Sequence, residues 1–140
     1  MRVIFITIIS FVIILFGCST AKEASIEGLE VIQANFRHWS EAPLVQSDVR
    51  ERGTDLALIV NGLPDGANPE YIIFRKKKSF PAEITDTTEN GVRIQARIIM
   101  RSSVLAETSE TVDKSDRLVF RNADGKSSYI EIEEWSRMDE

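Results

Sequence analysis

The chain is poor in the residues that most often carry metal and acid–base chemistry. Its 140 residues include one cysteine, Cys18, and one histidine, His38. A single cysteine excludes an internal disulfide, and one cysteine with one histidine cannot supply the usual ligands of a zinc site. Basic residues are also few, 17 Lys and Arg against 22 Asp and Glu. This acidic balance argues against nonspecific nucleic-acid binding. We therefore expect no metal, no cofactor and no nucleic-acid partner.

The N-terminus carries a long apolar run. It extends from Val3 to Gly17 and is interrupted only by Thr7 and Ser10. A helix over this run would cover about 22 Å, whereas the hydrocarbon core of a bilayer measures about 30 Å. The run is therefore typical of the hydrophobic region of a signal peptide rather than of a membrane-spanning helix.

The end of this run, Leu15-Phe16-Gly17-Cys18, resembles the lipobox of bacterial lipoproteins. In that class a small residue precedes the cysteine and an aliphatic residue lies three positions before it, although Phe16 is bulkier than the usual residue. The resemblance implies cleavage behind Gly17 and a diacylglycerol on Cys18, with acyl chains such as palmitate that anchor the protein to the outer side of the cell membrane. Ser19 in place of aspartate implies the outer membrane, facing the periplasm, in a Gram-negative cell. The alternative is an ordinary buried thiol behind an uncleaved anchor.

These features predict three segments. Residues 1–17 form the signal peptide, residues 18–25 the lipidated cysteine and its tether, and residues 26–140 a single β domain. The tether from Ser19 to Ser25 reaches about 25 Å at most, so the domain stays near the membrane surface. Removal of the signal peptide leaves 16 basic and 22 acidic residues, a net charge of -6.

Short β-like patterns fill the rest of the chain, and they predict an all-β, two-sheet antiparallel sandwich, for which an immunoglobulin-like arrangement is one candidate. Residues 26–39 are ambiguous. Their apolar spacing and a Thr20–Glu23 capping box suit a helix, whereas the alternation of Ile32, Ala34 and Phe36 suits a strand. We favour the strand. Residues 104–112 are polar and suit either an edge strand or a loop. The other expected strands are residues 56–60, 71–75, 80–87 and 92–101, with one more on each side of the turn at residues 122–125.

Two hairpins have turns that suggest a register. Glu89-Asn90-Gly91 suits a three-residue loop, which would set Ala82 opposite Ile98 and Glu83 opposite Arg97. The stretch from Asn122 to Gly125 suits the same geometry and would set Leu118 opposite Ile130 and Arg117 opposite Glu131. Both Gly91 and Gly125 are expected to have positive φ.

Catalytic and metal signals are weak. His38 lies in Phe36-Arg37-His38-Trp39-Ser40 with no nucleophile-elbow motif nearby, so we favour a half-buried structural histidine over a Ser–His–Asp triad. Asn122, Asp124, Gly125 and Glu131 match four positions of a calcium-binding EF-hand loop, but Phe120 stands at its first ligand position. The hairpin turn explains these residues better.

Basic residues offer a possible patch for an anionic partner. Its candidate members are Arg75, Lys76, Lys77, Lys78, Arg93, Arg97 and Arg101. The alternative, which we favour, is that the lysines protect a sheet edge and that Arg97 pairs with Glu83. Trp39, beside Pro43 and two aliphatic residues, suits either an exposed protein-binding patch or, more simply, a plug in the end of the sandwich core.

Two functions follow from these patterns. The first is a non-catalytic binding or structural module, anchored to the membrane through Cys18, that contacts an envelope protein or an anionic envelope component. The second is a small hydrolase or ligand-binding protein that uses His38 or a pocket between the sheets. A Ser and an Asp within hydrogen-bond reach of His38 would favour the enzyme.

Overall fold

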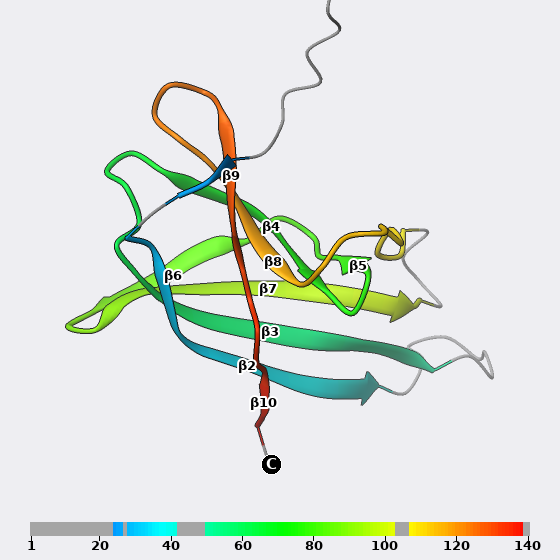
Figure 1. Cartoon of the computed structure of the whole chain (residues 1–140). Coiled ribbons are helices and arrows are strands. Elements are labelled where there is room, and N and C mark those ends of the chain that lie inside the picture. The colour runs from blue at the N-terminus through cyan, green and yellow to red at the C-terminus, as the bar shows by residue number, and fades with distance from the viewer. Residues whose placement is uncertain (1–23, 27, 42–49, 103–106, 139–140) are drawn as a thin grey trace, which may run out of the picture.

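The computed structural model describes residues 24–26, 28–41, 50–102 and 107–138, and these residues form two packed β-sheets (Figure 1). One sheet has the order β1-β9-β8-β4-β5, and the other has the order β10-β2-β3-β7-β6. The strands of the first sheet are β1 (Ala24–Ser25), β9 (Ser127–Glu131), β8 (Arg117–Arg121), β4 (Asn68–Phe74) and β5 (Lys77–Lys78). Those of the second are β10 (Ser136–Arg137), β2 (Glu30–Glu41), β3 (Glu51–Asn61), β7 (Gly91–Arg101) and β6 (Glu83–Thr88).

The order of the longer strands is that of an immunoglobulin domain. If β2, β3, β4, β6, β7, β8 and β9 are lettered A to G along the chain, the sheets read A-B-E-D and G-F-C. This is the constant-type arrangement of the immunoglobulin fold. The all-β sandwich expected from the sequence is therefore present, and the ambiguous segment that begins at residue 26 contains the strand β2 rather than a helix.

The core lies between the inner faces of the sheets, where alternate residues of each strand point toward the opposite sheet. In β3, for example, Leu56, Leu58 and Val60 are buried, as the apolar sequence of this central strand predicts. The fully buried side chains that face one another include Leu56, Leu58, Ile72, Ile94, Ile98, Leu118 and Phe120. Apolar packing thus links β3 to β8, the pair that corresponds to B and F of the immunoglobulin order.

The hairpin of β8 and β9 has the expected register. Leu118 lies opposite Ile130 and Arg117 opposite Glu131. Gly125 has a φ of 83° and its N–H donates to the Asn122 carbonyl oxygen over 2.9 Å. The turn interpretation of residues 122–131 is therefore confirmed, and the EF-hand interpretation is not needed.

The register expected for the β6–β7 hairpin is wrong. Glu83 lies opposite Gln95 rather than Arg97, because the turn has two residues instead of three and a bulge between Ile84 and Asp86 shifts the pairing by one residue more. The strand also begins later than expected. The Ser79 and Ala82 N–H groups donate to carbonyls of β4 in the other sheet, so residues 79–82 cross between the sheets. Gly91 does have positive φ, 143°, but it begins β7 directly after a two-residue turn at positions 89–90.

The chain also crosses between the sheets near its C-terminal end. After β9, Ile132 and Trp135 lead to β10, which pairs in parallel with β2 (Figure 1). Trp135 packs against the core and meets the Phe74 ring edge-on at 5.0 Å between centroids. This crossing closes one side of the sandwich.

Two sets of expectations concern residues outside the described part of the chain. Cys18, the lipobox and most of the tether lie there, as do residues 42–49 and 103–106 of the loops. Within the described residues, no helix has the length and apolarity needed to cross a bilayer. In the described part of the stretch 104–112, the one β-bridge joins Thr111 to Lys77.

Candidate functional site

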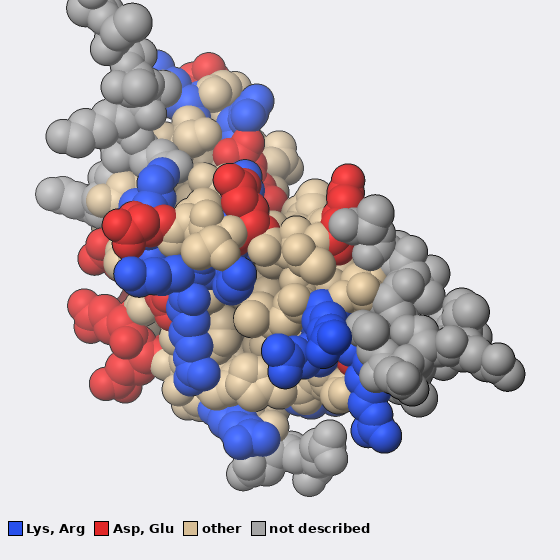
Figure 2. Space-filling model, turned by 90° about the vertical axis from the view of Figure 1, so that its right-hand side faces the viewer, with Lys and Arg blue, Asp and Glu red and all other residues tan. Residues whose placement is uncertain are grey.

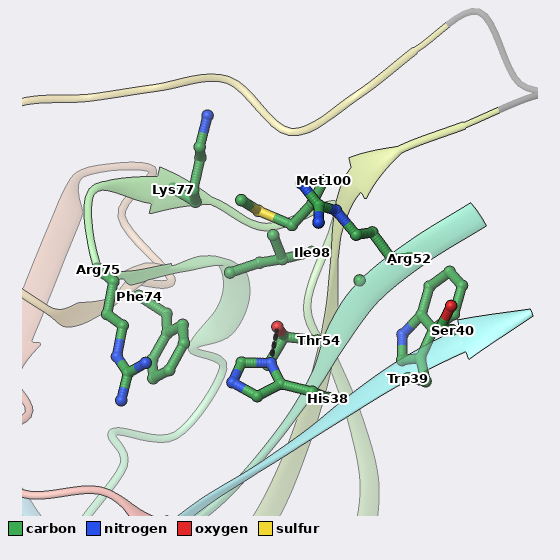
Figure 3. A pocket seen from close by; sticks show the side chains of 11 residues that line it. His38, Trp39, Ser40, Arg52, Thr54, Phe74, Arg75, Lys77, Ile98 and Met100 are labelled. Carbon is green, nitrogen blue, oxygen red and sulfur yellow. Dashed lines mark hydrogen bonds between the residues drawn. The ribbon is translucent and has the colours of Figure 1, made fainter. Parts of the chain in front are cut away.

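A pocket of about 770 Å³ opens between the two sheets at one end of the sandwich (Figure 3). It lies where β2 ends, β3 begins, and β4 turns into β5. The described chain begins at β1, which pairs with Ser128 and Tyr129 of β9 near the other end of that sheet. The residues that line the pocket are His38, Trp39, Ser40, Arg52, Gly53, Thr54, Phe74, Arg75, Lys77, Ile98 and Met100.

Apolar side chains make one part of this lining. Phe74 and Ile98 are buried in the core and present one side to the pocket, whereas Met100 is 44% exposed. Met100 is one of the few large apolar side chains of the described chain that are exposed to this degree. An exposed apolar side chain beside a pocket is a common feature of ligand-binding sites.

Three cations, Arg52, Arg75 and Lys77, make the other part. Among the described residues none of the three forms an ion pair, although Lys77 Nζ donates to Thr111 Oγ1 over 2.6 Å. The described lining contains no Asp or Glu. Figure 2, which faces this end, shows Lys and Arg side chains around an uncharged surface. The pocket is thus cationic in an acidic protein.

The β4–β5 turn fixes Arg75 in an unusual backbone conformation. Arg75 and Lys76 have φ values of 48° and 63°, in the left-handed region that a type I′ hairpin turn requires and that Asn and Gly usually occupy. Asp116 stabilises this turn, because its Oδ1 accepts a 2.7 Å hydrogen bond from the Arg75 N–H and its Oδ2 accepts one from Trp135 Nε1. The Arg75 guanidinium lies over the Phe36 and Phe74 rings, 5.0 and 4.8 Å from their centroids.

His38 lies on the inner face of β2 beside this pocket. A 2.8 Å hydrogen bond joins its Nδ1 to Thr54 Oγ1, and its ring meets Phe36 at 5.1 Å between centroids. Ser40 also lines the pocket, but the described lining offers His38 no carboxylate. The described residues therefore do not assemble a Ser–His–Asp triad at His38.

The outer face of the same sheet carries a separate charged cluster. Asp55 receives a hydrogen bond from Arg97 over 2.7 Å and forms an ion pair with Arg37 over 3.5 Å. The hydrogen bond to Asp55 raises the pKa of Arg97 above its ordinary value. The Arg97 guanidinium carbon also lies 4.9 Å from the centroid of the Trp39 ring. Arg97 therefore pairs with Asp55, and the expected pairing of Arg97 with Glu83 is wrong.

Trp39 does not plug the core, contrary to the simpler expectation. It lies opposite Gly53 on the outer face, and a Cβ at Gly53 would come within 2.6 Å of Trp39 Cζ2. The tryptophan that fills the core end is Trp135. Residues 42–45 of the proposed Trp39 patch lie outside the described chain.

The structure divides the seven candidate patch residues. Arg75 and Lys77 line the pocket, whereas Lys76 pairs with Asp113 over 3.1 Å and Lys78 lies over the Tyr71 ring at 4.4 Å. Lys77 and Lys78 form β5, the edge strand of their sheet. The remaining three, Arg93, Arg97 and Arg101, are exposed residues of β7, and none of them lines this pocket.

Several pocket residues carry no sequence signal of their own. Arg52, Ile98 and Met100 come from strands far from residues 75–77 in the chain, and only the pairing of β3 with β7 brings them together. No sequence pattern distinguishes Asp116 from the rest of the 22 Asp and Glu residues. Among the described residues, no group of three potential metal ligands is present. Comparisons with protein-family models, curated proteins and solved structures found no match.

Proposed function

We propose that this chain is a membrane-anchored lipoprotein of the cell envelope that acts as a non-catalytic binding module. The observation that carries the binding role is the pocket, where Arg52, Arg75 and Lys77 lie beside an apolar floor and their side chains form no ion pair among the described residues. The lipobox-like Leu15-Phe16-Gly17-Cys18 supports the anchoring role.

The position of the pocket suits such a module. The tether would join the domain at β1, beside β9, and the pocket lies at the opposite end of β4 (Figure 1). In the anchored protein the pocket is then directed away from the membrane to which Cys18 is attached, toward components of the envelope. Binding there needs only surface and charge, and the described lining supplies both.

The hydrolase alternative rests on His38, which lines the pocket beside Thr54 and Ser40. A histidine whose Nδ1 is bonded to a threonine hydroxyl lacks the carboxylate that orients the imidazole in a Ser–His–Asp triad. A non-catalytic pocket therefore accounts better for the described residues.

The test expresses the full chain and its Cys18→Ala variant in a bacterial host, with metabolic labelling by an alkyne-tagged fatty acid. We expect label and membrane association in the wild type, and an unlabelled, uncleaved precursor in the variant. Equal labelling of both proteins would refute the anchor. Turnover of acyl esters by the purified wild type, lost in His38→Ala with the fold intact, would refute the non-catalytic role.

A further inference from the structure

The cations of the pocket differ in their surroundings from the arginines of the outer face. Arg37 and Arg97 share Asp55, which neutralises one of their two charges. The guanidinium groups of Arg52 and Arg75 form no ion pair among the described residues, and the Lys77 ammonium is bonded to a neutral hydroxyl. An anion that approaches this protein therefore finds more unneutralised positive charge at the pocket than beside Asp55.

The donors of these side chains suit a compact oxyanion. A guanidinium carries five N–H donors in a planar fork, and an ammonium carries three. Carboxylate and phosphate oxygens accept such hydrogen bonds in short, charge-assisted geometry, often two from one arginine. Cations at this opening attract a carboxylate or a phosphate group, whereas an ammonium group would be repelled.

The floor suits an apolar chain. Phe74 and Ile98 belong to the core, and the exposed Met100 adds a flexible side chain that adapts to irregular shapes. Figure 3 shows these side chains between Arg75 and Lys77 on one side and Arg52 on the other. The volume of about 770 Å³ lies within the range of small-molecule pockets.

The site is also held in place before any ligand arrives. Asp116 bonds both the Arg75 N–H and Trp135 Nε1, and Trp135 packs on Phe74. The 110–112 segment bonds the turn from the other side, because the Val112 N–H donates to the Lys76 carbonyl and the Lys78 N–H to the Glu110 carbonyl. A fixed site loses less conformational entropy on binding.

We propose that this pocket binds a small amphiphilic anion, with a carboxylate or phosphate headgroup attracted to the cations Arg52, Arg75 and Lys77 and an apolar chain laid over Phe74, Ile98 and Met100. This inference rests on the binding role proposed above and names the chemistry of its ligand.

The experiment uses the full lipoprotein in phosphatidylcholine nanodiscs, with empty nanodiscs as the blank, and measures binding by isothermal titration calorimetry. The probes are octanoate, octyl phosphate, octanol, octylamine and inorganic phosphate. We expect octanoate, octyl phosphate or both to bind at least about tenfold more tightly than the last three, the scale of a lost charged hydrogen bond. The stronger of the first two identifies the headgroup. Binding of octanol equal to both anions, or preference for octylamine, would overturn the inference.

Variants separate the pocket from general charge. The triple change Arg52→Gln, Arg75→Gln, Lys77→Gln removes the cations of the pocket, and the matched control Arg93→Gln, Lys126→Gln, Arg137→Gln removes three exposed cations that do not line it. We expect at least a tenfold loss in the first and less than a twofold change in the second. Equal effects would overturn the inference. If the first variant does not fold, Lys77→Gln alone and Met100→Gln replace it, each expected to weaken binding severalfold.

The two proposals fail in distinguishable ways. Tight binding of octylamine would leave a binding module with a different ligand class, whereas absence of label at Cys18 would remove the anchor and leave the pocket chemistry intact. Raising the NaCl concentration should weaken octanoate binding, because salt screens the attraction between the headgroup and the cations. Binding that is indifferent to salt would contradict the role of the three cations.

Discussion

The β4–β5 turn allows a prediction in which stability and binding change in opposite directions. Replacing Arg75 and Lys76 by Asn and Gly gives the sequence that type I′ turns prefer. The wild-type residues hold φ values of 48° and 63°, and the left-handed conformation costs an ordinary residue about 1–2 kcal/mol. The double variant should therefore be more stable than the wild type while losing the Arg75 guanidinium from the pocket.

The magnitude follows from what is gained and lost. Relief at two positions contributes about 2–3 kcal/mol, since Asn itself retains part of the cost. The glycine loses about 0.5–1 kcal/mol through the entropy of the unfolded chain, and the contacts of Arg75 with the Phe36 and Phe74 rings are worth about 0.5–1 kcal/mol. The exposed Lys76–Asp113 pair contributes less than about 1 kcal/mol. The free energy of unfolding should rise by about 1 kcal/mol.

Urea denaturation followed by circular dichroism measures this change. With a slope of about 1–1.5 kcal/mol per molar urea, the midpoint should rise by about 0.7–1 M. Lys76→Gly alone is the matched control, because Lys76 does not line the pocket; it should keep ligand binding and retain part of the gain. Arg75→Pro should lower the midpoint, because proline cannot adopt positive φ. A lower midpoint in both glycine variants would refute the argument that the turn is strained.

Three further changes test the packing of the sandwich, each by urea denaturation. Gly53→Ala should lower the free energy of unfolding by about 1–3 kcal/mol, because the new Cβ would meet the Ile98 carbonyl oxygen and lie 2.6 Å from Trp39 Cζ2. An unchanged urea midpoint would mean that Trp39 does not cover this glycine. Leu58→Ala removes a side chain that is 0% exposed and should lower the free energy of unfolding by about 2–5 kcal/mol. A decrease of less than about 1 kcal/mol would argue against the sheet packing described. Gly125→Val should cost about 1–3 kcal/mol through backbone strain at a φ of 83°, since nothing lies within 4 Å of the added Cβ; wild-type stability would contradict that turn geometry.

The predictability of the fold differs between the two hairpins. The β8–β9 register could be predicted, because turn residues 122–125 and the Arg117–Glu131 pair both specify it without a bulge. The β6–β7 register could not, because its bulge and the crossing of residues 79–82 depend on bonds to β4 and β7 that no local pattern encodes. The sandwich itself followed from alternation, which each strand carries in its own residues.

The pocket was predictable only in part for a similar reason. The cationic run pointed to Arg75 and Lys77 as candidates. The left-handed turn between them could not be predicted, because its positions are occupied by Arg75 and Lys76 rather than by Gly or Asn. Arg52 joins them through the register of β3, and Met100 through that of β7. The charges could be read along the chain, whereas their position at one pocket depends on the order of the strands.

Pairing between distant parts of the chain has a consequence for the timing of folding. Both sheets depend on residues 127–137, because β1 pairs with β9 and β2 pairs with β10. A nascent chain that has emerged from the ribosome only as far as residue 126 would leave β2 and β8 with unpaired edges. Such edges recruit other strands, so premature collapse would favour aggregation. Residues 127–137 must therefore have been synthesised before this domain can close, and until then the exposed edges of β2 and β8 are open to other strands.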